Sequence, residues 1–311
     1  MDLPFQIAHV KAPPIKCQGI KTKLLPFIFS SIRWEDNGTN RWVEPFMGSG
    51  VAVLNLVPRR ALLGDTNRHV INFYQAIQRG ELSGESVREF LVCEGKKLLA
   101  QGADYYYEVR KRFNLEGSPY DFLFLNRSCF NGVMRFNSAG EFNVPFCRKP
   151  ERFSQAYITK IVNQINWAAR QMRGKDWQFR VGKWSDTLSE AKEGDFVYLD
   201  PPYIGRHVDY YNSWGHADAR MLAQVAKKLL CGFALSMWLA NKYRENTHIH
   251  QYWYGLEVRS CSHFYHVGSH ESLRNEMEEA LVIKPGFAAS ATAEECSAIP
   301  PRSKQLLLAL P

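Results

Sequence analysis

The hydrophobic pattern of the chain predicts a mostly parallel β-sheet with helices on both of its faces. Several short segments have the length and pattern of strands, namely residues 41–44, 61–64, 177–181, 196–199 and 233–237, and residues 196–199 form the apolar run of a buried strand. Segments with apolar residues at helical spacing follow some of them, such as residues 67–77 and 217–230. Because strands that alternate with helices favour a parallel sheet, we expect an α/β fold. Residues 256–258 and 280–283 are expected to close the sheet as an antiparallel pair.

The amino-acid pattern changes between residues 70 and 158, which predicts a module inserted into the α/β domain. Residues 81–115 have the pattern of helices rich in charge and tyrosine, and residues 119–150 are aromatic, asparagine-rich and basic. Within the second stretch, Gly132–Phe136 and Glu141–Phe146 flank a turn that contains glycine. That arrangement predicts a β-hairpin.

The expected domain organisation is therefore discontinuous. Residues 1–69 and 159–285 would form one α/β domain, and residues 70–158 an inserted helical and β-hairpin domain. Residues 286–311 are small and polar, and we expect them to form a disordered tail. An enzyme core interrupted by a recognition module has this organisation, and so do many other α/β proteins with insertions.

The composition of the chain indicates what kind of partner it binds and in which cellular compartment it works. The chain of 311 residues has a net charge of +8, which favours a polyanion, because neutralised phosphates release condensed counterions. Many basic proteins nevertheless bind no nucleic acid. The seven cysteines are scattered, which argues against a disulfide framework or a zinc site. We see neither a signal peptide nor a membrane-spanning run, and we expect a cytoplasmic protein.

A glycine pair and an acidic residue indicate a nucleoside-binding pocket. Gly48 and Gly50 fall at a predicted strand-to-helix turn, where glycine lets the backbone approach a ligand closely. Asp65 ends the next strand, where a carboxylate can accept hydrogen bonds from both hydroxyls of a ribose. The third glycine of the dinucleotide fingerprint is absent, so we expect a nucleoside with a small charged group. The alternative is a pair of turn glycines and a helix-capping aspartate.

The tetrad Asp200-Pro201-Pro202-Tyr203 follows a predicted buried strand directly. Two prolines cannot continue a central strand, so the chain must leave the sheet at its carboxyl edge, where open α/β sheets bind ligands. Asp200 and the carbonyl of Pro201 can each accept a hydrogen bond from an exocyclic amine. Tyr203 offers an aromatic face to a base. A structural diproline turn is the alternative.

Taken together, these motifs resemble those of the DNA amino-methyltransferases, which modify exocyclic nitrogens of bases. The order of glycine motif, basic hairpin segment and tetrad is similar to that of the Dam-type adenine methyltransferases, the alpha group of the D12 class. The similarity covers about residues 12–284, and the matching motifs are residues 14–21, 44–50, 125–132, 140–146 and 200–203. Residues 20–23, 200–215 and 263–268 are most similar to modification methyltransferases of that group.

The resemblance implies a Rossmann-like methyltransferase core. Its members transfer a methyl group from S-adenosylmethionine to adenine N6 in double-stranded DNA, with the base flipped out of the helix, and leave S-adenosylhomocysteine. The cofactor contacts implied for this chain are Cys17, Lys21, Phe46, Gly48, Gly50, Asp65 and Asp200. Trp184 either flanks the cofactor adenine or is a core tryptophan.

The resemblance also implies DNA contacts within the inserted module. The residues concerned are Arg127, Phe130, Asn131, Arg135, Asn137 and Pro145. Arg135 can reach the O6/N7 edge of a guanine in the major groove, with a phosphate contact or a surface salt bridge as the alternative. Phe130 and Asn131 would fill or pair with the gap that a flipped base leaves. Arg127 would contact phosphate or simply belong to the solvated surface.

Target and biological setting stay open at this point. The resemblance favours the site GATATC, with GATC as the Dam-like option, and a monomer of bacterial or phage origin. A cognate restriction endonuclease would not contact the chain directly. Methylation of cytosine N4 and a non-catalytic DNA-binding relative are the alternatives. His263, His266 and His270 lack a carboxylate or thiolate partner, so we predict no metal site.

Overall fold

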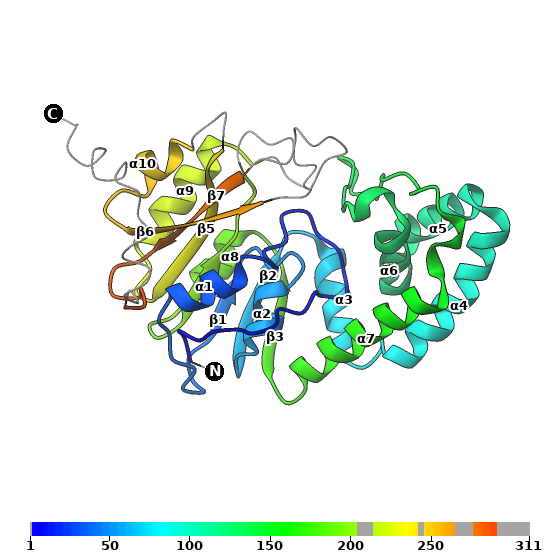
Figure 1. The fold of residues 1–311 in the computed structure, drawn as a ribbon, viewed down its shortest axis with the longest axis horizontal. Helices are drawn as coiled ribbons and strands as arrows, with labels where there is room; N and C mark the ends of the chain where they lie inside the picture. Colours follow the sequence, from blue (N-terminus) through cyan, green and yellow to red (C-terminus); the bar gives the residue numbers. More distant parts are fainter. Residues whose placement is uncertain (1, 204–213, 242–245, 265–275, 291–311) are drawn as a thin grey trace.

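A computed structural model describes residues 2–203, 214–241, 246–264 and 276–290 of the chain. Their strands form one sheet with the order β3-β2-β1-β4-β5-β7-β6 (Figure 1). The strands are β1 (Trp42–Glu44), β2 (Arg60–Asp65), β3 (Asp176–Val181), β4 (Phe196–Leu199), β5 (Gly232–Asn241), β6 (Glu257–Phe264) and β7 (Glu276–Ile283). The pairs among β1 to β5 are parallel, and β7 is antiparallel to both β5 and β6. The mostly parallel sheet and its closing antiparallel pair are therefore confirmed.

Each central strand divides its side chains between two buried cores, one on each face of the sheet. In β1, Trp42 enters the first core and Val43 the second. In β4, Phe196 and Val197 divide in the same way. Successive side chains of a strand point to opposite faces, and a strand that is covered on both faces therefore has a continuous apolar sequence. This is why short apolar runs were sufficient to locate these strands.

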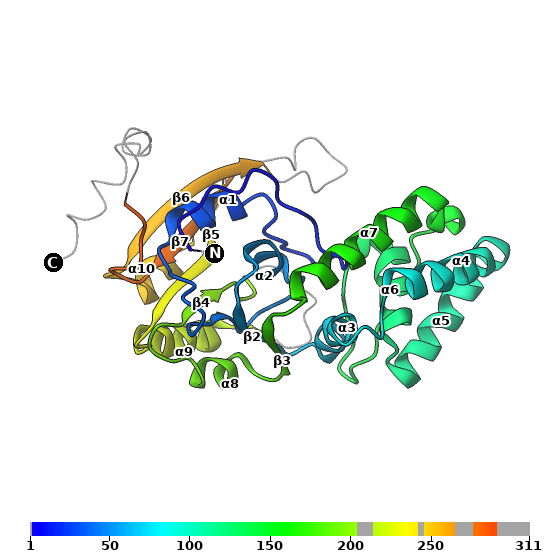
Figure 2. The same cartoon turned by 90° about the horizontal axis from the view of Figure 1, so that it is seen from below.

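Helices cover both faces, as the sequence predicts. The first core includes residues of α1 (Leu25–Ser31), α2 (Val51–Leu56), α3 (Arg68–Gln78) and α7 (Gln155–Met172). The second core includes residues of α8 (Trp184–Ser189), α9 (His216–Lys227) and α10 (His248–Tyr252). Figure 2 shows α1 and α9 on opposite sides of the sheet. In the parts of the chain that the structure describes, no helix is both long and apolar enough to span a bilayer.

Three further helices lie beside the sheet, at the opposite end of the molecule from β6 (Figure 1). They are α4 (Gly84–Gln101), α5 (Ala103–Glu116) and α6 (Pro119–Ser128). Two short 3-10 turns, Phe130–Gly132 and Pro150–Phe153, lie between α6 and α7. The boundaries expected at residues 70 and 158 fall inside α3 and α7. Helix α3 contacts both the sheet, at β2 and β3, and the outer helix α6.

The predicted hairpin at residues 132–146 is only partly formed. Its turn closes at Asn137, and Phe136 bridges Phe142, but the described residues on either side form no regular strand ladder. The backbone N–H and carbonyl of Phe142 instead bond the side chain of Asn114 on α5, at 2.8 and 3.2 Å. Both phenylalanines are buried in the first core. The segment therefore packs on a helix, which a period-two pattern does not reveal.

Three parts of the sequence interpretation lie outside the described residues. They are the tail from residue 291 onward, the pair His266 and His270, and residues 204–213 after the tetrad.

The strand order places three predicted motifs at one edge of the sheet. β1 lies between β2 and β4, so the strand order reverses direction at β1. In open α/β sheets, ligands bind in the crevice outside the carboxyl ends of the strands at such a switch point. The glycine turn follows β1, Asp65 ends β2, and the tetrad follows β4. Segments that are far apart in sequence therefore meet at this edge.

Candidate active site

A cavity of about 500 Å³ lies at the carboxyl ends of β1, β2 and β4. Most of the residues that the sequence assigns to the cofactor line it: Cys17, Lys21, Phe46, Gly48, Asp65 and Asp200. Pro202 also lines the cavity, whereas Gly50 does not. The fold thus brings the N-terminal segment, the glycine turn and the tetrad around one space.

The glycine turn forms one wall of this cavity. Gly48 has a φ of +50° and Gly50 a φ of +68°, a region that glycine enters without steric cost. A Cβ on Gly50 would lie 2.8 Å from Met47 Cε, and Gly50 is the residue that precedes α2. Gly50 therefore shapes the turn, while Gly48 faces the cavity.

The backbone holds the Asp65 carboxylate at the cavity wall. Its Oδ2 accepts a hydrogen bond from the Gly48 N–H and its Oδ1 one from the Asn67 N–H, each at 2.8 Å. Burial raises the pKa of Asp65, and these hydrogen bonds oppose the rise. Each carboxylate oxygen can accept more than one hydrogen bond. A vicinal diol in the cavity can therefore donate to this group.

A buried ion pair links the N-terminal segment to the tetrad. Lys21 is 3% exposed, and its Nζ lies 2.8 Å from Asp200 Oδ1, which also accepts a hydrogen bond from Ser236 Oγ at 3.2 Å. Burial raises the pKa of Asp200, and the Lys21 ammonium opposes that rise. For Lys21, burial lowers the pKa, but the Asp200 carboxylate raises it well above its usual value. The ammonium thus favours the ionised form of Asp200.

The remaining tetrad residues border a second, smaller cavity of about 30 Å³, which Pro201 and Tyr203 line. The Tyr203 hydroxyl donates to Glu279 Oε2 on β7 at 2.7 Å. Lys21 Nζ lies 4.8 Å from the centre of the Tyr203 ring. Tyr203 is therefore held at both its hydroxyl and its ring.

Glu44 is a cavity residue that the sequence interpretation missed. It ends β1, it is buried, and it lines the cavity. Trp42 Nε1 donates to its Oε1 at 2.6 Å, a neutral hydrogen bond that leaves the carboxylate available to a cation. Burial raises the pKa of Glu44 to about 8, because water is excluded and Asp200 is also negative. The available signal was an acidic residue at the end of an otherwise apolar strand.

Three aromatic side chains form another part of the cavity wall. The ring centroid of Phe46 lies 6.5 Å from that of Trp184 and 5.6 Å from that of Trp214. The two tryptophan rings are 6.4 Å apart. Trp184 both lines the cavity and packs against the second core. Its position is therefore compatible with either of the two roles expected from the sequence, a neighbour of the cofactor adenine or a core tryptophan. Trp214 was missed, because no local pattern marks it.

Outside the cavity, three of the predicted DNA contacts are exposed beside one another. Phe130 is 54% exposed, and Asn131 and Pro145 are exposed as well. The Phe130 N–H donates to the Pro145 carbonyl at 2.8 Å, and Asn131 adopts a φ of +53°. This arrangement projects the Phe130 ring away from the fold.

Arg135 and Asn137 occupy the neighbouring turn. Arg135 is half-buried, and its Nε donates to Asn143 Oδ1 at 2.8 Å, which orients the guanidinium. The Asn137 side-chain oxygen accepts hydrogen bonds from the Ala139 and Glu141 N–H groups. Asn137 is therefore a turn-forming residue here.

Arg127 occupies a different environment from the one expected. It is 3% exposed, and its guanidinium donates to the Pro14 carbonyl and to Gln164 Oε1. Burial lowers its pKa. A buried guanidinium with two protein partners cannot reach a phosphate, so the expected phosphate contact is corrected to a structural link between α6 and the N-terminal segment.

In the described part of the chain, no group of three or more histidine, cysteine, aspartate or glutamate side chains is placed to hold a metal ion. The sequence analysis considered His263, His266 and His270 as metal ligands, and the last two lie outside the described residues.

Comparison with known proteins shows the family to which the chain belongs. The family model of the D12 class N6 adenine-specific DNA methyltransferases matches residues 18–270. The chain belongs to that family. It is 31% identical to the DNA adenine methylase of Serratia marcescens, over 68% of this chain and 77% of that protein. It is 29% identical to the DNA adenine methylase of Escherichia coli K12, over 80% of this chain and 88% of that protein.

Among solved structures, the rRNA methyltransferase aviRa from Streptomyces viridochromogenes aligns with 84% of this chain and 80% of its own, at 13% identity and a TM-score of 0.30. A likeness of that size carries no structural argument.

Proposed function

We propose that this chain transfers a methyl group from S-adenosylmethionine to adenine N6 within a short site in duplex DNA. The observation that carries the proposal is a single cavity in which Asp65, Glu44 and Asp200 each present a carboxylate. Three carboxylates around one space match the polar groups of a nucleoside that carries an amino acid, with the tetrad at the edge of that space. Residues 1–69 and 159–285 would supply this site, and residues 70–158 would recognise the target.

The lining fits S-adenosylmethionine group by group. Asp65 would accept hydrogen bonds from the ribose hydroxyls, and the rings of Phe46, Trp184 and Trp214, which line or border the cavity, would offer apolar faces to the adenine. Glu44 offers a buried carboxylate to the ammonium of the methionine part. When bound, the sulfonium supplies an activated methyl group. Gly48 allows close approach of the backbone, and Gly50 keeps the turn in shape.

The tetrad would act on the amine that receives the methyl group. The Asp200 carboxylate and the Pro201 carbonyl would accept its two N–H groups and favour its tetrahedral form. The Lys21 ammonium favours the ionised form of Asp200, which this role requires. Most of the rate enhancement would come from positioning and from preorganised charge. The target base must leave the duplex to reach this site.

Glu44 gives a proton-linked prediction. Because its pKa is about 8, the free protein holds a proton there at pH 7, and a bound ammonium favours the ionised form. Binding of S-adenosylhomocysteine at pH 7 should therefore release up to about one proton. Glu44→Gln should abolish the release and weaken binding roughly ten- to a hundredfold. Calorimetry in buffers of different ionisation enthalpy measures both quantities.

Glu190→Gln provides the matched control, because Glu190 pairs with Arg180 at the surface. It should leave both the affinity and the proton release unchanged. Equal proton release by wild type and Glu44→Gln would remove Glu44 from the ammonium site.

Arg135 gives a specificity prediction. If its guanidinium reads a guanine, Arg135→Ala should reduce discrimination against duplexes lacking that guanine by about five- to a hundredfold. Lys149→Ala, which removes an exposed charge, should instead weaken all duplexes alike. Ratios of kcat/KM on matched and substituted duplexes measure this. An unchanged ratio in Arg135→Ala would assign Arg135 to a phosphate or structural contact.

The target site can be read from methylated plasmid DNA by single-molecule sequencing. We expect modified adenine in GATATC, and modification of every GATC would instead indicate the Dam-like target. Phe130 and Asn131, exposed next to Pro145, would fill the gap left by the flipped base. Modification of cytosine N4 alone would refute the assignment to adenine.

A further inference from the structure

The N-terminal strap, residues 11–17, runs from α2 across α7 and α6 to the cofactor cavity. Side chains of these three helices fasten its backbone at successive points: Asn55 of α2 at Lys11, Gln164 of α7 at Ala12, Arg127 of α6 at Pro14, and Asn126 of α6 at Lys16. Because these partners lie on different elements, the course of the strap is set by tertiary structure.

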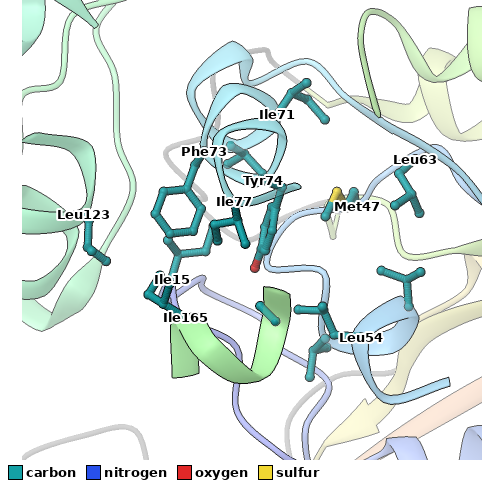
Figure 3. Packing of buried hydrophobic residues seen from close by; sticks show 14 of the residues in the cluster. Ile15, Met47, Leu54, Leu63, Ile71, Phe73, Tyr74, Ile77, Leu123 and Ile165 are labelled. Carbon is teal, nitrogen blue, oxygen red and sulfur yellow. The ribbon is translucent and has the colours of Figure 1, made fainter. Parts of the chain in front are cut away.

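Of these contacts, that of Asn126 is nearest to the cavity along the strap, and it consists of two hydrogen bonds to Lys16. Its Oδ1 accepts a hydrogen bond from the Lys16 N–H at 2.8 Å, and its Nδ2 donates to the Lys16 carbonyl at 2.9 Å. The Asn126 side chain is 0% exposed. One residue earlier, Ile15 is buried in the same cluster as Phe73 and Ile165 (Figure 3). The strap is therefore fixed in position at Lys16 by both polar and apolar contacts.

The two segments joined by the Asn126–Lys16 contact each continue to residues with proposed functional roles. The strap ends at Cys17, which lines the cavity. Lys21, four residues farther along the chain, also lines it and pairs with Asp200. On α6, the chain continues into the exposed Phe130 and Asn131. A Cβ added to Gly132, at the end of that turn, would overlap the Lys16 side chain. Lys16 thus lies between the exposed turn and the cavity.

We propose that Asn126 is a positioning residue for the methyl-transfer site: by clamping Lys16 it sets the strap so that Lys21 reaches Asp200. The inference rests on the proposed function. Asn126 itself lies outside the cavity lining, so its effect must pass through the strap. A shift of α6 at the exposed turn would be transmitted to the cavity by the same two hydrogen bonds.

The chain contains its own matched control. Asn55 makes the same pair of hydrogen bonds to the backbone of Lys11, at 2.9 and 3.0 Å, but five residues farther from the cavity along the strap. Asn126→Ala should raise the Kd of S-adenosylhomocysteine roughly tenfold in the absence of DNA, the equivalent of one lost buried hydrogen bond. Asn55→Ala should change it by less than about twofold.

A pH profile distinguishes positioning from general destabilisation. If the Lys21–Asp200 pair is disturbed, the acid limb of kcat in Asn126→Ala should move to higher pH, in the same direction as in Lys21→Met. Loss of stability alone would lower the amount of active protein without moving that limb. Hydrogen exchange of the peptide containing residues 12–21 should also accelerate in Asn126→Ala.

The outcomes separate the two proposals. Failure of the wild-type protein to bind S-adenosylhomocysteine would refute the proposed function. Wild-type binding together with an unchanged Kd and an unchanged pH limb in Asn126→Ala would overturn the positioning role alone. If Asn126→Ala does not fold, Asn126→Asp keeps the size of the side chain and its acceptor for the Lys16 N–H but replaces the amide that donates to the Lys16 carbonyl. It should then show the same directions at smaller size, and no change in it would likewise overturn the role.

Discussion

Asp200→Asn is expected to lower the single-turnover methylation rate about a hundred- to a thousandfold while leaving binding to duplex DNA intact. The substitution keeps the shape of the side chain but removes the charge that pairs with Lys21 and accepts a hydrogen bond from Ser236. A neutral amide stabilises the developing ammonium of the attacking amine far less than a carboxylate. Rapid mixing with labelled S-adenosylmethionine and a short duplex measures the rate, and fluorescence anisotropy measures the binding.

Asp176→Asn makes the same chemical change on an exposed carboxylate that pairs with Arg60 at the other end of the sheet. Its rate should stay within about twofold of wild type. A rate in Asp200→Asn equal to that of this control would exclude Asp200 from the chemical step.

Lys21→Met should lower the rate at neutral pH about a hundredfold and move the acid limb of the profile to higher pH. Removing the ammonium leaves burial free to raise the pKa of Asp200 further. The active form is the ionised carboxylate, which is present above that pKa and is lost as the pH falls through it. Activity of the variant should therefore recover partly as the pH rises, because a higher pH restores the carboxylate. Breaking a buried pair costs about 3–5 kcal/mol, so thermal unfolding must be followed as well.

Lys23→Met is the matched control for this variant, because Lys23 is exposed two residues farther along the chain. Its pH profile should superimpose on that of the wild type. Identical profiles for all three proteins would show that Lys21 does not tune Asp200.

Features set by local sequence could be predicted. A central strand such as β4 has an apolar sequence because both of its faces are buried. Asn67 could be predicted as a helix cap because asparagine favours that position, and its side chain does accept a hydrogen bond from the His69 N–H. Parallel strands have their carboxyl ends at one edge, so Asp65 and Asp200 could be expected to meet there. Each of these inferences needs only a short stretch of sequence and a rule of geometry.

Features set by tertiary contacts could not be predicted. Arg127 lies only three residues before the exposed Phe130, yet α6 directs it inward onto the Pro14 carbonyl. Glu44 became a candidate only when the sheet placed it beside the cavity, and Trp214 only when it met Phe46. The hairpin was predicted as a regular strand pair, because the sequence does not show that the Asn114 side chain bonds the backbone N–H and carbonyl of Phe142.

The most direct test of the proposed function is nucleoside analysis of duplex DNA after incubation with the protein and labelled S-adenosylmethionine. The label should appear in N6-methyladenine, in wild type and in the Asp176→Asn control, and should be lost in Asp200→Asn. Label in N4-methylcytosine alone, or no transfer to DNA by a wild-type protein that is folded, would contradict the account.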